Sequence, residues 1–320
     1  MEGRKITHVQ TLYIAYNRHN EVNLNLGFIQ AEYATGSVRS KLALMTGTYA
    51  NANLADEPGV LKNIFEANAG IKISKNKDLW VDAGVFASHI GFESAIGAHC
   101  WNMTRSILAD NSPYYESGVK ISYTNENGKW FFSGLLLNGW QTMQRIPGNQ
   151  TPAFGHQLTW QPTEKIVLNS SSFIGNVMPD SIRQMRYFHN FYGQFELNGK
   201  LSLIAGFDIG AQQKIKQSSL LDTWFSPVLI GRYKLSQKLQ IAARYEYYAD
   251  RNEVMIYTGT PNGFQTHGYS LNIDAKVQAH VLWRVEGRVF TGHKDKVFLD
   301  KQQNPASTSC FVGISFSAGF

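Results

Sequence analysis

A strict alternation of charged and apolar residues is the feature that most constrains the fold of this chain. The stretch HVLWRVEGRVFTG, residues 280–292, carries charges at every second position, at Arg284, Glu286 and Arg288. Val281, Trp283, Val285 and Val289 fill most of the places between them. Successive side chains of a β-strand point to opposite faces, so the stretch predicts a strand with one charged and one apolar face. Such a strand belongs either to a soluble sandwich whose charged face is exposed to solvent or to a membrane barrel whose charges line a lumen.

The spacing of similar stretches separates these two folds. No helical periodicity persists, and alternating segments recur between connections of two lengths. The short connections lie at 35–37, 75–78, 125–129, 162–165, 198–200, 236–238 and 277–279. The outer connections are a short one at 17–20 and long ones at 50–62, 88–112, 141–152, 177–186, 211–221, 250–266 and 293–306. This alternation is typical of an up-and-down meander in the outer membrane, whereas a sandwich needs crossovers.

We therefore predict an all-β fold, a single antiparallel up-and-down transmembrane β-barrel over residues 1–320. Counting the connections gives about 16 strands, with about 14 or 18 as alternatives. The short turns would be periplasmic and the longer loops extracellular. Charged residues are 17% of the chain, against roughly 25% in soluble domains, as expected when much of the surface does not meet water.

Composition also argues against other classes of protein. The net charge is +6, but the lysines and arginines are dispersed, so nucleic-acid binding is not expected. No run of about 18 apolar residues exists, so a transmembrane helix is not predicted. The N-terminal residues MEGRKITHVQ lack the apolar core of a signal peptide, and we expect the export signal to be absent from this chain.

The last predicted strand, CFVGISFSAGF, ends on an aromatic residue. Phe316 and Phe320 share its apolar face with Val312, Ile314 and Ala318. This arrangement resembles the C-terminal signal that the outer-membrane assembly machinery recognises in its substrates. We expect Phe316 and Phe320 to form such a signal and the assembly machinery to be a partner during biogenesis.

Several longer stretches resemble the OmpL-like β-barrel porin family, also called type-2 β-barrel porins, of Gram-negative outer membranes. They include YNRHNEVNLNLGFIQAEY at 16–33, DAGVFASHIGFESAIGAHCWNMTRSILADNSPYYESGVK at 82–120 and TGTPNGFQTHGYSLN at 258–272. The resemblance implies an outer-membrane location, contact with lipid and a channel for passive diffusion of small hydrophilic solutes. From the residues themselves we expect no enzyme activity and no cofactor, and a homo-oligomer is left open.

The inward face of the predicted barrel gives the candidate pore-lining residues. A barrel of about 16 strands leaves a lumen on the order of 20 Å wide inside its side chains. The inward side chains are expected to be polar and often small, unlike a packed core. The charged residues predicted to line the pore are Arg39, Lys41, Asp82, Asp208, Arg232, Arg244, Glu246, Asp274, Arg284, Glu286 and Arg288.

The longest outer connection, 88–112, is a candidate constriction loop. It combines apolar residues with His89, Glu93, Arg105 and Asp110. Because that apolar content is costly on a splayed external loop, we expect the loop to fold into the lumen and face basic residues of the opposite wall. The alternative is a small external cap.

Other constellations favour ordinary structural interpretations. Ser170, Ser171 and Ser172 with His156 or His189 could form a serine–histidine pair of a barrel lipase, but small serines on a barrel wall are ordinary. No histidine spacing predicts a metal site. Cys100 and Cys310 are expected to be separate thiols rather than a disulfide. The alternative function is a non-conducting barrel whose loops bind a surface or a partner.

Overall fold

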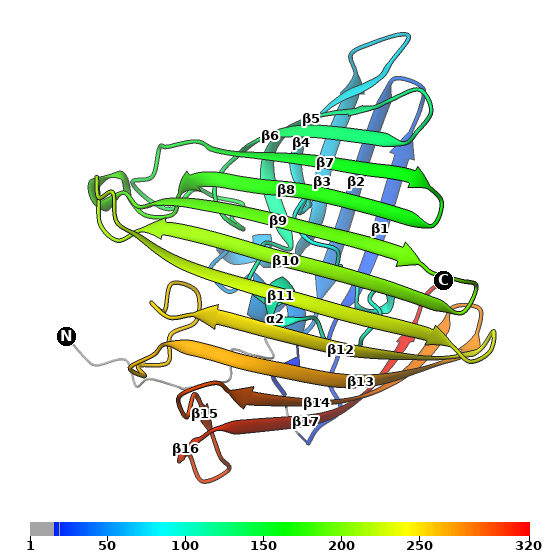
Figure 1. Cartoon of the computed structure of the whole chain (residues 1–320). Helices are drawn as coiled ribbons and strands as arrows, with labels where there is room; N and C mark the ends of the chain where they lie inside the picture. The colour runs from blue at the N-terminus through cyan, green and yellow to red at the C-terminus, as the bar shows by residue number, and fades with distance from the viewer. Residues whose placement is uncertain (1–15, 19) are drawn as a thin grey trace.

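The computed structural model describes residues 16–18 and 20–320, and its main element is one antiparallel sheet of 15 strands. The strands follow one another in chain order, so each pairs with its sequence neighbours (Figure 1). They are β1 (Gly27–Ala34), β2 (Val38–Thr46), β3 (Ile64–Lys72), β4 (Asp78–Ala87), β5 (Tyr115–Thr124), β6 (Trp130–Leu137), β7 (Ala153–Thr163), β8 (Ile166–Asn176), β9 (Met185–Glu196), β10 (Leu201–Gln213), β11 (Leu221–Lys234), β12 (Leu239–Asp250), β13 (Phe264–Gln278), β14 (Val281–Gly292) and β17 (Thr308–Ala318).

The remaining elements lie in the long connections. They are α1 (Thr48–Asn53), η2 (Gly59–Asn63), η3 (Gly97–His99), α2 (Ile107–Asp110), η4 (Asp180–Ile182) and the small hairpin of β15 (Phe298–Leu299) and β16 (Pro305–Ala306). In the described residues, no helix has the length and apolar character needed to cross a membrane.

The predicted meander and its alternation of short and long connections are confirmed. All seven short turns and the seven long connections fall where the sequence places them, within a few residues. The strand expected before residue 17 lies outside the described residues. Within them, β1 and β17 are the two ends of the sheet.

The turn between β5 and β6 illustrates how the sequence makes a short connection. The side-chain Oδ1 of Asn125 accepts a hydrogen bond from the amide of Trp130 at 3.0 Å. Gly128 follows with a φ of 69°, a left-handed conformation that costs glycine nothing. Asparagine and glycine at these positions reverse the chain within a few residues.

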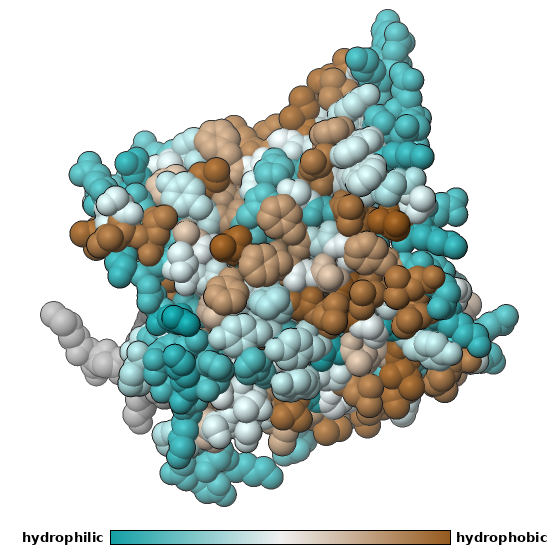
Figure 2. Space-filling model, viewed as in Figure 1, coloured by the Kyte–Doolittle hydropathy of each residue, from teal (hydrophilic) through white to brown (hydrophobic). Residues whose placement is uncertain are grey.

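The outer face of the sheet is apolar, as the alternation predicts. In β14, Trp283, Val285 and Val289 are exposed, whereas Arg284 and Arg288 are buried on the opposite face. Figure 2 shows apolar residues across the middle of the visible outer face and hydrophilic residues mainly toward its two ends. An apolar band with polar ends is the surface that a lipid bilayer solvates.

The inner face differs from the prediction at the outer ends of the strands. We expected polar, small inward residues, but Phe173, Phe188, Trp224 and Phe290 are buried there in one apolar cluster. Trp140 packs edge-on against Phe173 and Phe188 with ring centroids 5.0 Å apart. The long connections supply the apolar partners that make these inward aromatics favourable.

The two cysteines and the C-terminal phenylalanines lie apart from this core. Cys100 is buried and Cys310 is exposed, and both are free thiols, which confirms the preference for separate cysteines. Phe316 and Phe320 are exposed on the outer face and at the chain end. Their role in assembly stays a prediction.

Candidate functional site

The connection between β4 and β5, residues 88–114, is called the inner segment here because the sheet wraps around it. Its base is closed by a 3.0 Å hydrogen bond from the amide of Ser88 to the carbonyl of Tyr114. Asn102, Thr104, Ser106 and Ile107 are each at most 2% exposed. Surface loops leave their backbone to water, so this burial places the inner segment inside the curl of the sheet (Figure 1).

Contacts to one wall hold the inner segment in place through its backbone. The amide of Thr104 donates to Glu286 of β14 at 2.6 Å, and the amide of Ile107 donates to Glu246 of β12 at 2.6 Å. The amide of Met103 donates to the side chain of Asn272 in β13 at 3.1 Å. These wall residues satisfy buried amides that a non-helical segment cannot pair internally.

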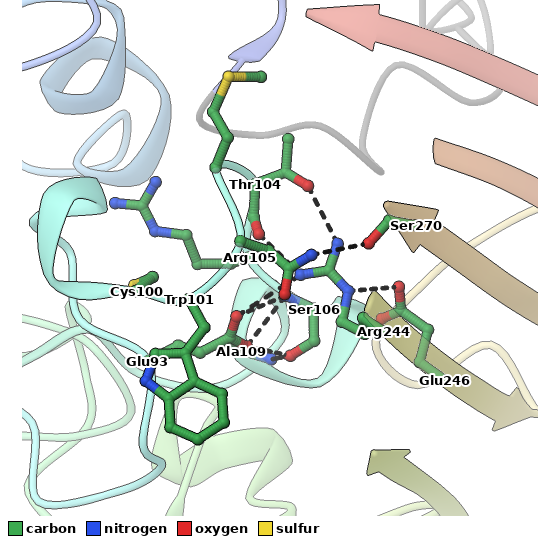
Figure 3. Close-up of polar contacts among 12 residues, drawn as sticks. Glu93, Cys100, Trp101, Thr104, Arg105, Ser106, Ala109, Arg244, Glu246 and Ser270 are labelled. Atoms are coloured by element: carbon green, nitrogen blue, oxygen red, sulfur yellow. Dashed lines mark hydrogen bonds and ion pairs between the residues drawn. The ribbon is translucent and has the colours of Figure 1, made fainter. Parts of the chain in front are cut away.

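Two arginines join these carboxylates into one buried network, and Figure 3 shows its part around Arg244, Glu246 and Glu93. Arg244 lies 3.2 Å from both Glu246 and Glu286, and 3.6 Å from Glu93 of the inner segment. Arg288 lies 2.7 Å from Glu246. With no water to screen them, these pairs are strong only as a complete set, because losing one partner leaves a buried charge.

Arginine also binds carbonyl groups of the inner segment. Arg244 donates to the carbonyl of Thr104 at 2.7 Å, and Arg288 donates to the carbonyl of Arg105 at 2.9 Å. Arg284 pairs with Asp274 at 2.7 Å and donates to the carbonyls of the inner-segment residues Gly97 and Cys100. The arginines of β12 and β14 therefore bind both carboxylates of the wall and carbonyls of the inner segment.

Strand β2, near the other end of the strand order, holds charges that water reaches. Arg39 pairs with Asp82 and lies over the Trp80 ring, with its side chain 38% exposed. Lys41 lies between Glu32 and Glu66, with its side chain 30% exposed. The inner segment thus fills the side of the interior next to β12–β14 and leaves charged groups accessible along β2.

A cavity of about 250 Å³ separates the inner segment from β2, β3 and the α1 connection. Phe92 and Glu93 line one side of it, and Met45, Tyr49 and Glu66 line the other. Beside the cavity, Ala95 and Tyr114 of the inner segment pack against Met45 and Tyr49 in one buried apolar cluster, so the segment also contacts this wall.

The other predicted site residues have separate partners. Asp208 accepts a hydrogen bond from Asn190, and Arg232 lies over the Trp101 ring at 4.2 Å. His89 Nε2 lies 2.8 Å from the carbonyl of Ser172. Arg105 donates to carbonyls within its own segment, at Ser94 and Ala95, rather than facing the opposite wall.

Burial changes the protonation of three groups in the inner segment. It raises the pKa of Asp110 to about 7, although Tyr114 donates to that carboxylate at 2.7 Å. It lowers the pKa of His89 to about 4. Burial also raises the pKa of Glu93 against the opposing effect of Arg244. Each shift favours the neutral form, as expected away from water.

Sequence reasoning missed the uncharged residues of this site. Thr104 both donates to Glu286 and accepts from Arg244, and Asn102 donates to Ser270 at 3.0 Å. Threonine and asparagine are ordinary loop residues, and no local pattern distinguished them. Only the three-dimensional pairing of the inner segment with β12–β14 identifies them.

Two of the three serines considered for catalysis, Ser170 and Ser172, lie on the outer face with His156 and His189. Ser172 Oγ is 2.6 Å from His156 Nδ1, and Ser170 Oγ is 3.0 Å from His189 Nε2. The intervening Ser171 points inward and is buried. No cluster of three or more histidine, cysteine or acidic residues suited to a metal ion occurs in the part of the chain that the structure describes.

A family model described as "Putative beta-barrel porin-2, OmpL-like" matches residues 2–320. No individually curated protein matches the chain.

Solved porins share the fold. An anion-selective porin from Comamonas acidovorans matches with a TM-score of 0.64 and 8% identity, over 92% of this chain and 89% of that one. In-vitro folded OmpT of Vibrio cholerae matches with a TM-score of 0.58 and 10% identity, over 92% and 88%. The trimer form of that OmpT matches with a TM-score of 0.54 and 11% identity, over 91% and 88%. At these identities the likeness concerns the fold alone.

Proposed function

The chain belongs to the OmpL-like β-barrel porin-2 family, an outer-membrane porin family and so a non-enzymatic class, and we propose that it forms a water-filled channel. The channel admits small hydrophilic solutes by passive diffusion. The path runs between the inner segment and the wall that carries Arg39 and Lys41. The inner segment acts as the constriction, and its position is set by the buried network of Arg244, Glu246, Glu286 and Arg288.

The observation that supports this path is the unequal exposure of the inward charges. The side chains of Arg39 and Lys41 are 38% and 30% exposed, whereas those of Arg244 and Arg288 are not exposed at all. Water therefore reaches Arg39 and Lys41 on the β2 wall and does not reach Arg244 and Arg288 on the β12–β14 wall. A diffusing solute follows the hydrated charges, because it keeps its own hydration there.

The accessible wall carries both signs of charge. Arg39 and Lys41 lie beside Asp82, Glu32 and Glu66. Such a mixture suits uncharged solutes and gives only a mild preference among ions, since each base has an acid within ion-pair distance. We propose a general hydrophilic path rather than a strongly selective one.

One observation favours the second candidate function, a non-conducting barrel that binds a partner through its loops. The inward aromatics, together with Ile90 and Ile107 of the inner segment, form a buried cluster at the outer ends of the strands. A fully sealed interior would leave the outer loops as the functional surface. The charges accessible along β2 make the channel the better supported of the two.

We also propose the outer membrane of a Gram-negative bacterium as the location, with lipid against the apolar outer face. Association of copies is proposed by analogy with the trimer form of Vibrio cholerae OmpT.

Liposome swelling separates the two candidate functions. Liposomes containing the purified full-length protein are placed in isotonic solutions of uncharged sugars of increasing size, beside empty liposomes. A channel gives swelling that slows as the sugar grows. If no sugar makes the protein-containing liposomes swell faster than empty liposomes, the result would instead favour the partner-binding barrel.

A further inference from the structure

Arg186, near the start of β9, differs from the other buried arginines in its partners. Arg244, Arg284 and Arg288 each pair with a carboxylate. Arg105 donates to two backbone carbonyls of its own segment. Arg186 is 8% exposed, yet no acidic side chain of the described residues lies within ion-pair distance of it.

The guanidinium of Arg186 is nevertheless held in a defined orientation. Its Nε and Nη2 both donate to Oε1 of Gln212, at 3.0 and 2.7 Å. Its carbon lies 4.8 Å from the Trp140 ring centroid and 5.5 Å from that of Trp224. Two indoles and one amide thus fix the group, and Nη1 has no protein acceptor among the described residues.

The carboxylates of Asp250 and Asp180 have hydrogen-bond partners of their own. Asp250 accepts hydrogen bonds from the amides of Val254, Met255 and Ile256. Asp180 accepts from the amide of Gln150 and the hydroxyl of Thr151. Among the described residues, no carboxylate therefore pairs directly with Arg186, and Asp250 acts on its charge only at longer range.

Arg186 lines a cavity of about 170 Å³ at the outer end of the sheet. The other walls come from the two outer connections after β6 and β8, and they include Trp140, Asn138, Asn149 and Thr142. Thr142 adds a second polar group that can hydrogen-bond a ligand, because its hydroxyl is buried without a partner in the described part of the chain. The space equals that of about five or six water molecules at roughly 30 Å³ each.

We propose that this cavity binds a small oxyanion, the carboxylate of an organic acid or a phosphate, on the free edge of Arg186. Oxyanions supply the charge and the acceptors that the guanidinium lacks, and an ion of four to six heavy atoms fits the space. Gln212 is a positioning residue: its Oε1 accepts hydrogen bonds from Nε and Nη2 of Arg186, which leaves Nη1 for the anion. The further step, that such oxyanions are the solutes that the channel admits, rests on the proposed function. Binding of an oxyanion in the cavity does not require the channel to conduct.

Isothermal titration calorimetry on the full-length protein in detergent micelles tests the site with sodium lactate, sodium acetate and sodium phosphate. Glycerol is the uncharged probe, and sodium chloride keeps the ionic strength constant. We expect saturable binding of the oxyanions at one site per chain and none of glycerol. The tighter of lactate and phosphate identifies which oxyanion the cavity prefers.

Arg186→Gln should weaken oxyanion binding about 10-fold to 100-fold, the range for a hydrogen bond to a charged group. Lys200→Gln, an equal loss of charge in the exposed turn between β9 and β10, is the matched control and should leave binding unchanged. Equal binding by the Arg186 and Lys200 variants, or no binding of any oxyanion by the unaltered protein, would overturn the proposal.

A second measurement covers the case in which Arg186→Gln does not fold. In the unaltered protein, lactate should change tryptophan fluorescence saturably, because Trp140 and Trp224 flank the guanidinium, while chloride at equal ionic strength should not. The absence of a saturable change would overturn the site. Binding without conductance would contradict only the channel, and conductance without binding only this site.

Discussion

Glu246 of β12 and Arg288 of β14 form a 2.7 Å ion pair that crosses the strand between them. Gly268 of β13 stands opposite Glu246 in the strand register. A Cβ atom at Gly268 would lie 2.7 Å from Cγ of Glu246 and 2.8 Å from the ring of Phe290. The missing side chain at residue 268 is what lets the carboxylate reach over β13 to the arginine.

Gly268→Ala should therefore lower the thermal stability of the barrel. The added methyl group forces Glu246 or Phe290 to move, and overpacking of this kind costs about 1–3 kcal/mol. Gly287→Ala is the control, because a Cβ there meets nothing within 4 Å. Thermal unfolding followed by circular dichroism should show a lower midpoint for the first variant only. Equal midpoints for the two variants would mean that the ion pair does not depend on the glycine.

Glu246→Gln should loosen the inner segment. The substitution takes a carboxylate from both Arg244 and Arg288 and weakens the acceptor for the amide of Ile107. Removing one partner of a buried ion pair costs about 3–5 kcal/mol. Limited trypsin digestion should then cleave the chain after Arg105 faster than in the unaltered protein.

The control for that digestion is Glu126→Gln, which removes an equal charge from an exposed turn. It should leave cleavage after Arg105 as slow as in the unaltered protein. If Glu246→Gln is cleaved equally slowly, the buried network does not hold the inner segment.

The inner segment should become less stable as the pH rises from about 4 to about 7. Burial raises the pKa of Asp110 from 3.8 to about 7, so the folded segment keeps a proton that the released segment gives up. The stabilisation is complete below pH 3.8 and is lost as the pH passes about 7. Tyr114, Arg105 and Arg288 oppose the shift and Glu93 adds to it.

Hydrogen exchange of the amides of α2 measures this effect, after correction for the intrinsic pH dependence of exchange. Protection should fall between about pH 4 and about pH 7 in the unaltered protein and stay constant in Asp110→Asn. The same fall in both proteins would assign the pH dependence to another group.

Arg39→Gln combined with Lys41→Gln should shift ion selectivity toward cations. Both side chains lie on the accessible wall, so their charge acts on ions in the proposed path. Reversal potentials in a salt gradient measure the shift, with Lys165→Gln in an exposed turn as the control. Selectivity identical to that of the control would place the path elsewhere.

The sequence predicted the fold well because its information is local. Charges at alternate positions of β14 define the two faces of that strand, and Asn125 with Gly128 defines a turn. Each prediction depends on residues close together in the chain, where the period of two and the turn residues act directly.

The site was predictable only in part, because its partners are distant in sequence. The apolar content of residues 88–112 indicated a buried loop, and the structure places that loop inside the sheet. Which charges remain accessible depends on the pairing of Arg284 and Arg288 with groups that no spacing reveals. Neutralising these two arginines should therefore release the inner segment in addition to changing the charge of the wall.

Single-channel recording in planar lipid bilayers tests the central claim most directly. The unaltered protein and a variant lacking residues 90–108 are compared in the same salt solution. We predict discrete conductance steps for the unaltered protein and larger steps for the variant, since the deletion removes the constriction. No steps from either folded protein would contradict the channel, and equal steps would contradict the role of the inner segment.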